Sequence, residues 1–153
     1  MRPLKLALIL ALTLSPLAIA SPALADKAPI WTSFGSKVAI KGYDPVAYFT
    51  AGKPVQGTSQ YKVNYQGAEF QFSSAANRDA FAANPARYAP QFGGYCAWAV
   101  SQGYTAGIDP NAWAIVGGKL YLNYNKDIQA RWQQNTAGNI AAANRNWPTV
   151  LKK

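Results

Sequence analysis

The fold is decided by the stretch YKVNYQGAEFQFSS, residues 61–74. Large apolar residues alternate with polar ones before Gln66-Gly67, and two phenylalanines alternate with polar residues after it. A period of two places every second side chain on one face of a strand. A glycine between two such runs permits the positive φ of a tight turn. The stretch therefore predicts a β-hairpin with its turn at Gln66-Gly67.

A helix is predicted directly after this hairpin. Either Ser73 or Ser74 can cap it, because a serine hydroxyl accepts a hydrogen bond from an otherwise unpaired N–H of the first turn. The residues that follow are mostly good helix formers, up to Asn84-Pro85. Since proline cannot continue a helix, the helix should end there.

The chain before the hairpin predicts a strand and a turn. Val38 and Ile40 alternate with Lys37, Ala39 and Lys41, which favours a short strand at the start of the domain. Asp44-Pro45 favours a turn, because the residue before proline is extended and proline fixes its own φ. An aspartate at such a position is expected to accept a hydrogen bond from the backbone rather than to act in catalysis.

The same order of features returns at a constant offset of 51 in the numbering, which places Gly67 on Gly118. Asp109-Pro110 predicts a turn, Gly117-Gly118 the turn of a second hairpin, and Asn125 the cap of another helix. A last helix is expected around residues 138–145. This order predicts an α+β fold: a small mixed or antiparallel sheet with β-hairpins, and helices packed on one side of it. Whether the two halves are an internal duplication stays open at this point.

The N-terminal segment, residues 1–25, has the pattern of a cleaved signal peptide. Arg2 and Lys5 precede an apolar run, which ends in small residues of the Ala-x-Ala type before Asp26. A membrane anchor is the alternative, but prolines interrupt a run that is shorter than the roughly 20 apolar residues of a spanning helix. We therefore expect a periplasmic or secreted protein with a polar lead-in at residues 26–36, a single domain at residues 37–150, and no membrane span after cleavage.

The composition excludes several kinds of chemistry. The chain has no histidine and one cysteine, so a histidine base, a histidine metal ligand and an intrachain disulfide are all excluded. Removing Arg2 and Lys5 lowers the formal charge of +9 by two, to +7. The basic residues are dispersed along the chain, which favours a solvated surface over a nucleic-acid interface. The expected partner is therefore a small ligand or a component of the cell envelope, and no cofactor is expected.

The first half resembles the YHS domain. The resemblance rests on GYDPV at 42–46, YQGAEFQFSS at 65–74, and the aromatic and proline residues of 81–88, and it covers roughly residues 38–90. The tail, residues 93–147, is similar to the extension of secreted members. The resemblance is to a family whose metal-handling members are expected to bind metal through cysteines. In this sequence the matching positions are Ala47, Ser73 and Asn77. The resemblance therefore implies no metal site at these positions.

The residues that shape turns and helix caps are expected to have a structural role. The resemblance implies that Asp44 and Pro45 set the turn and that Ser73 caps the helix. The full set of residues expected to shape the chain is Asp44, Pro45, Gly67, Ser73, Gly93, Gly94, Asp109 and Gly118.

Cys96 and nearby aromatic residues are the candidates for ligand binding. Cys96 follows Gly93-Gly94 near the start of a run whose length predicts a helix of about two and a half turns, with a buried strand as the alternative. It is either a reactive thiol or metal ligand, or a small buried residue with a raised pKa. Aromatic rings beside glycine and proline turns either line a pocket or pack in the core. The candidate binding residues are Cys96, Tyr95, Trp98, Tyr48 and Tyr104.

Three hypotheses follow from these residues. The first is an exported, non-catalytic, YHS-like binding module for a small ligand or an envelope component. The second is a copper or zinc accessory protein that uses Cys96. The third is a thiol-dependent enzyme, which lacks a histidine base and has its six acidic residues scattered along the chain. The first is favoured, with no catalytic residue assigned.

Overall fold

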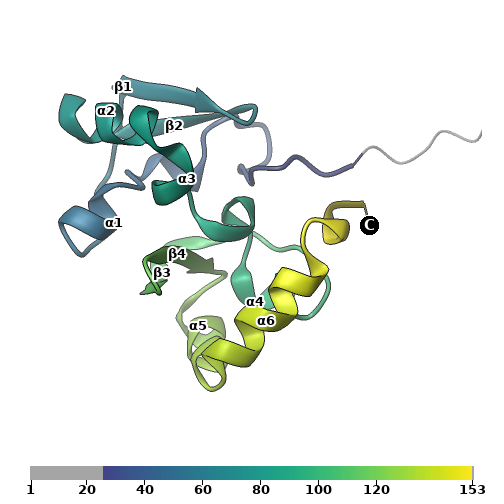
Figure 1. The fold of residues 1–153 in the computed structure, drawn as a ribbon. Helices are drawn as coiled ribbons and strands as arrows, with labels where there is room; N and C mark the ends of the chain where they lie inside the picture. The colour runs from purple at the N-terminus through teal and green to yellow at the C-terminus, as the bar shows by residue number, and fades with distance from the viewer. Residues whose placement is uncertain (1–25, 153) are drawn as a thin grey trace, which may run out of the picture.

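The computed structural model describes residues 26–152, and these form two halves that lie one above the other in Figure 1. The predicted signal peptide at residues 1–25 lies outside the described residues. The first half contains η1 (Ile40–Gly42), α1 (Ala47–Thr50), β1 (Thr58–Tyr65), β2 (Ala68–Phe72), α2 (Ala75–Ala83) and α3 (Pro85–Tyr88). The second half contains η2 (Gln91–Gly94), α4 (Ala97–Ser101), β3 (Asp109–Val116), β4 (Lys119–Asn123), α5 (Lys126–Gln133), α6 (Thr136–Asn146) and η3 (Thr149–Lys152).

Both predicted hairpins are confirmed, as is the α+β class. β1 pairs antiparallel with β2 across the Gln66-Gly67 turn, and β3 pairs antiparallel with β4 across the Gly117-Gly118 turn. Gly67 and Gly118 have φ of 84° and 73°, the left-handed conformation that glycine adopts without strain. The strands form two separate two-stranded sheets rather than one sheet. Local alternation predicts each strand, whereas the association of hairpins into a sheet depends on contacts distant in sequence.

The two halves repeat one structure at the offset of 51 that the sequence shows. β1 and β2, shifted by this offset, coincide in their bounds with β3 and β4. The strand pairing repeats too: Thr58 pairs with Phe72, and the equivalent Asp109 pairs with Asn123, each followed by the same irregularity of register. A polar N-cap, Ser74 or Asn125, precedes the helix after each hairpin. The possible internal duplication is therefore present as a structural repeat.

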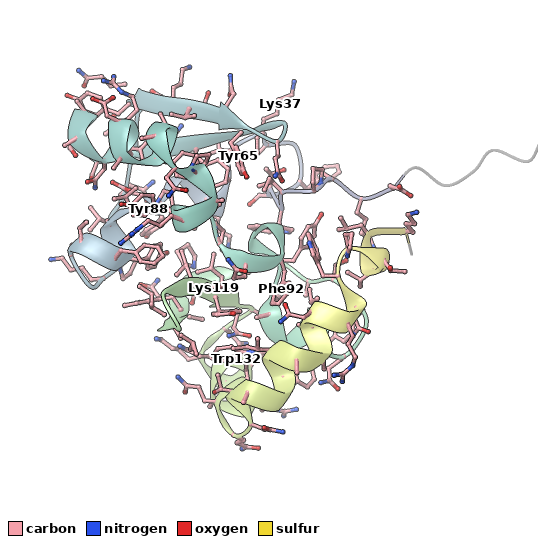
Figure 2. All side chains as sticks on the ribbon, in the orientation of Figure 1. Lys37, Tyr65, Tyr88, Phe92, Lys119 and Trp132 are labelled. Carbon is pink, nitrogen blue, oxygen red and sulfur yellow. The ribbon has the colours of Figure 1, made fainter. Side chains whose placement is uncertain are left out.

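Matched aromatic rings fill the core of each repeat. The rings of Phe70 and Phe81 lie 4.9 Å apart, and those of their equivalents Tyr121 and Trp132 lie 5.4 Å apart. These four residues are buried, and Figure 2 shows Trp132 in the lower half among β4, α5 and α6. The core therefore repeats together with the backbone.

The second hairpin lies between two apolar clusters. Leu120 and Leu122 on β4 belong to the cluster that contains Phe70 and Phe81 of the first repeat. Tyr121, on the other face of β4, belongs to the cluster of the second repeat. Since neighbouring residues of a strand point to opposite faces, β4 contributes to both clusters at once.

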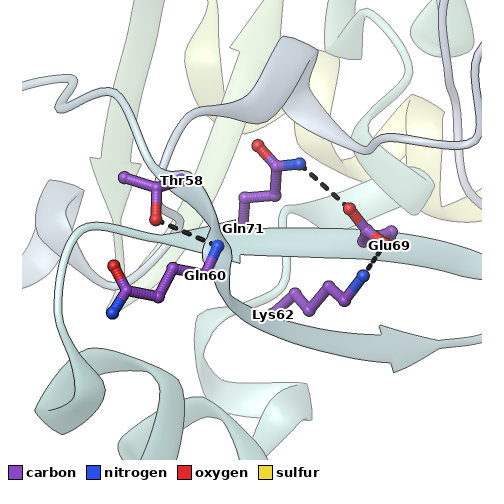
Figure 3. A network of polar contacts seen from close by, with 5 residues as sticks. All are labelled: Thr58, Gln60, Lys62, Glu69 and Gln71. Atoms are coloured by element: carbon purple, nitrogen blue, oxygen red, sulfur yellow. Dashed lines mark hydrogen bonds and ion pairs between the residues drawn. The ribbon is translucent and has the colours of Figure 1, made fainter.

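The first hairpin keeps one face polar. On that face Glu69 accepts a hydrogen bond from Gln71 at 2.9 Å and pairs with Lys62 at 3.3 Å, as Figure 3 shows. The hydrogen bond from Gln71, together with the Lys62 ammonium, lowers the pKa of Glu69.

The basic residues Lys37 and Lys119 are exposed on different halves, consistent with the dispersed charge (Figure 2). Among residues 26–152, no helix is long and apolar enough to span a membrane.

Three local predictions are wrong in detail. Residues 38–40 form no strand: Val38 and Ala39 form isolated bridges with Glu69 and Thr32, and Ile40 has a left-handed φ of 51° that ends extended structure. Asp109-Pro110 begins β3 instead of forming a separate turn, although Asp109 accepts from the Asn111 N–H as expected of an aspartate before proline. The helix after Cys96 is shorter than predicted and covers only Ala97–Ser101. Periodicity does not reveal where a backbone turns left-handed.

The lead-in packs against the second repeat. Ile30 is buried, and the Trp31 N–H donates to the Gly93 carbonyl at 2.8 Å. Gly93 has a φ of 61°, and a Cβ atom at this position would lie 1.8 Å from the Pro29 carbonyl oxygen. Glycine is therefore required where the lead-in crosses the chain.

Candidate functional site

The carboxylate of Asp44 is the centre of a closed polar cluster in the first repeat. Its Oδ1 accepts from the backbone N–H groups of Val46 and Ala47, at 2.8 and 3.2 Å. Its Oδ2 accepts from the Ser73 N–H and hydroxyl, at 2.9 and 2.7 Å, and from Asn77 Nδ2 at 2.7 Å. Asp44 is fully buried, so these five donors replace its hydration. The predicted role of Asp44 as a turn acceptor is confirmed.

This cluster corrects the predicted role of Ser73. The N-cap of α2 is Ser74, whose hydroxyl accepts from the Asn77 N–H at 3.1 Å. Ser73 instead connects α2 to the Asp44-Pro45 turn through both its N–H and its hydroxyl. The sequence offers two adjacent serines, and only the tertiary position of Asp44 distinguishes them.

The three positions that the YHS resemblance relates to cysteine ligands meet at Asp44. Ala47, Ser73 and Asn77 come from α1, the end of β2 and α2, and each donates at least one hydrogen bond to this carboxylate. A carboxylate has about four lone-pair sites, and five donors already occupy them. Methyl, hydroxyl and amide groups offer no thiolate. The residues present do not fit a metal ion.

The equivalent positions of the second repeat surround a pocket instead. The same offset relates Ala47, Ser73 and Asn77 to Trp98, Tyr124 and Ile128. All three of these equivalents line a cavity of about 210 Å³. The complete lining is Cys96, Trp98, Ala99, Tyr104, Ala106, Tyr124 and Ile128.

The lining of this pocket is almost wholly apolar. Trp98 and Tyr104 meet edge to face, with ring centroids 6.3 Å apart. Tyr104 and Tyr124 are 47% and 56% exposed, so they form its rim, whereas Cys96 is 1% exposed and belongs to its floor. No charged residue is among the lining residues. The arrangement is suited to binding an uncharged group, and it provides no pair of groups for acid–base chemistry.

A buried amide replaces the carboxylate of the first repeat. Asn123 Oδ1 accepts from the Trp98 N–H at 3.1 Å, as Asp44 accepts from the equivalent Ala47 N–H. The Cys96 thiol donates to the same Oδ1 at 3.7 Å. Asn123 is fully buried, and its Nδ2 has no hydrogen-bond partner among the described residues. The second repeat therefore holds the start of α4 without a buried charge.

The environment of Cys96 keeps its thiol protonated. Burial raises the pKa of Cys96, and this outweighs the opposing effect of backbone N–H groups of Ala99, Tyr124 and Trp98 that face the sulfur. A protonated thiol is a poor nucleophile. Of the two alternatives for Cys96, these observations favour the small buried residue with a raised pKa.

Residues 46–92 match the family model described as YHS domain. This chain contains a YHS domain. A search of curated proteins found no match, and neither did a search of solved structures. The matched YHS segment ends at Phe92, so it includes Ala47, Ser73 and Asn77 but none of the residues that line the pocket.

Of the candidate binding residues, three meet beside the YHS segment and two do not. Cys96, Trp98 and Tyr104 line the pocket. Tyr48 is buried, and its hydroxyl donates to the Pro110 carbonyl at 2.8 Å, which connects the YHS segment to the second repeat. Tyr95 is also buried and donates to the Ala28 carbonyl at 2.8 Å. Tyr48 and Tyr95 are thus positioned as packing residues.

Sequence reasoning missed two walls of the pocket and its supporting amide. Tyr124 and Ile128 are the equivalents of Ser73 and Asn77, so the offset between the halves already contained the signal that identifies them. Asn123 is the equivalent of Phe72, and no sequence pattern marks it as a buried acceptor.

Proposed function

We propose that the protein is an exported, non-catalytic binding module whose ligand occupies the pocket of the second repeat. One observation carries this proposal: Cys96, Trp98 and Tyr104 converge on one apolar pocket with an exposed aromatic rim. Export rests on the signal pattern of residues 1–25. A small ligand is favoured over a large envelope component, because the cavity is only about 210 Å³.

The two alternative functions have weaker support. A thiol enzyme needs a base next to its nucleophile, and the residues that line the pocket with Cys96 include no carboxylate, lysine or arginine. A metal accessory protein needs further soft or anionic ligands around Cys96, and the atom that its thiol contacts is an amide oxygen of Asn123. Both alternatives are tested by the experiments below.

Native mass spectrometry of protein purified from the periplasm tests the proposal. We expect a mature chain that begins at Asp26 and carries a non-covalent small molecule. The variant Ile128→Trp fills the pocket and should lose this molecule. Ile115→Trp is the matched control, because Ile115 lies on the exposed side of β3 and does not line the pocket. Equal retention by both variants would place the ligand elsewhere, and a retained metal ion would support the accessory function.

A further inference from the structure

The position of the pocket within the repeat suggests what it binds. The pocket occupies, in the second repeat, the place that the Asp44 cluster occupies in the first. In the first repeat, Ser73 and Asn77 donate to Asp44 and so fill the space between the end of β2 and α2 with mutual hydrogen bonds. Trp98, Tyr124 and Ile128 have no such central carboxylate. The residue equivalent to Asp44 is Tyr95, whose hydroxyl bonds to the lead-in instead.

We infer that the second repeat binds an uncharged molecule built on a single aromatic ring, at the position where the first repeat holds its closed polar cluster. This inference rests on the proposed function and specifies the ligand of the same pocket. Three properties of the pocket define this class: its volume, its lack of charge and the rings in its wall.

The volume limits the ligand to about one ring. The cavity measures about 210 Å³. Pockets for drug-sized molecules measure roughly 300–1,000 Å³, whereas a cavity of about 150 Å³ accommodates benzene. A single ring with one or two small substituents therefore fits, and a fused polycycle or an oligosaccharide does not.

The lining excludes a charged ligand. An ion that enters an apolar site loses hydration, and only a paired charge or several hydrogen bonds compensate for this loss. The pocket wall contains no acidic or basic side chain. A carboxylate or an ammonium group on the ring would therefore weaken binding strongly.

The wall favours an aromatic ring over an aliphatic one. Trp98 and Tyr104 already form an edge-to-face pair, and Tyr124 adds a third ring to the lining. Aromatic pairs in offset-stacked or edge-to-face arrangements gain about 0.5–1.5 kcal/mol beyond the burial of their surface. The Cys96 thiol adds a small polarizable contact at the floor.

Three probes of similar size separate these properties. p-Cresol is neutral and aromatic, 4-methylcyclohexanol is neutral and aliphatic, and p-toluate is aromatic and anionic. Each is titrated into the uniformly ¹⁵N-labelled mature protein, and amide chemical shifts are followed by NMR. We expect p-cresol to shift the amides of Trp98, Tyr104 and Tyr124, with an affinity about tenfold higher than that of either other probe.

Two pocket variants and one control locate the binding. Ile128→Trp should abolish the p-cresol shifts by filling the cavity. Tyr124→Ala removes an exposed rim ring, so it should keep the fold and weaken p-cresol binding severalfold. Ile115→Trp should bind like the original protein.

The outcomes distinguish the ligand class from the proposed function. Binding of p-toluate or 4-methylcyclohexanol in the pocket as tight as that of p-cresol would overturn the class and leave the pocket as the binding site. If no probe shifts the pocket amides, or if Ile128→Trp and Tyr124→Ala leave all shifts unchanged, both the class and the pocket are overturned.

Discussion

Asn77 and Ile128 occupy the same place in the two repeats and have opposite surroundings. Asn77 donates to the buried carboxylate of Asp44 at 2.7 Å, whereas Ile128 is part of the wall of an apolar pocket. The backbone around them is the same: a hairpin of identical register, followed by a helix with a polar N-cap. One scaffold therefore supports a closed polar cluster in one repeat and an open pocket in the other.

Asp44→Asn should destabilise the protein by at least about 3 kcal/mol, because an amide cannot accept all five donors that surround the carboxylate. The control is Asp109→Asn, since Asp109 also precedes proline but, among residues 26–152, its Oδ1 accepts only from the N–H and the side-chain amide of Asn111. Asp109→Asn should lower the free energy of unfolding by less than about 1 kcal/mol, because asparagine keeps the acceptor oxygen. Urea unfolding of both variants measures the difference. Similar losses would show that Asp44 is no more than a local turn residue.

Gly93→Ala should destabilise the protein by about 3 kcal/mol or more, because the added Cβ would collide with the Pro29 carbonyl. Gly118→Ala is the control, since Gly118 also has a positive φ but open space around its Cα. Backbone strain alone should cost that variant roughly 1 kcal/mol. Thermal unfolding compares the two variants. Equal costs would mean that the lead-in does not pack on Gly93.

Cys96 should react slowly with a charged thiol reagent in the native protein. The sulfur is buried, and its raised pKa keeps the thiolate fraction small. Labelling of native and urea-unfolded protein at the same pH measures the ratio of rates, which should exceed about ten. Labelling that is equally fast in both states would contradict burial and would make Cys96 the first residue to test for reactivity.

Stability should fall as the pH rises above about 10, the usual pKa of tyrosine in an unfolded chain. Burial raises the pKa of Tyr48 in the folded state, so the unfolded chain loses this proton first and is stabilised relative to the fold. Tyr48→Phe removes the hydrogen bond to the Pro110 carbonyl, so its free energy of unfolding at neutral pH should be lower by about 1 kcal/mol. Its stability should then decline less steeply at alkaline pH in urea unfolding. A decline as steep as that of the original protein would exclude Tyr48 as a contributor.

Titration with Zn(II) and Cu(I) against a competing chelator should reveal no stoichiometric site of nanomolar affinity. The expectation follows from the saturated carboxylate of Asp44 and from the replacement of the family's cysteines by Ala47, Ser73 and Asn77. A tight site that disappears in Cys96→Ser would instead favour the metal accessory function.

Local sequence patterns predicted the parts of the fold that depend on neighbouring residues. The turns at Gly67 and Gly118 follow from alternation and glycine, and the cap at Asn125 follows from its amide before a helix. The separation into two sheets was not predicted, because it depends on long-range packing. The packing role of Tyr48 was not predicted either, because it depends on a hydrogen bond to Pro110, which lies in the other repeat.

The candidate site was predicted in part for the same reason. Cys96, Trp98 and Tyr104 are close in sequence, so glycine turns and aromatic composition indicated them together. Tyr124 and Ile128 approach them only because α5 packs behind the second hairpin as α2 packs behind the first. Applying the repeat to the family's cysteine positions would have identified both residues.

Because β4 lies between the two apolar clusters, we expect that neither repeat folds alone when the chain is cut between them. Leu120 and Leu122 cover the same cluster as Phe70 and Phe81, so a fragment that stops at Phe92 would expose that cluster to water. Such exposed apolar surface favours aggregation. We therefore expect the two repeats and the lead-in to fold as one unit, of which the family segment, residues 46–92, is only a part.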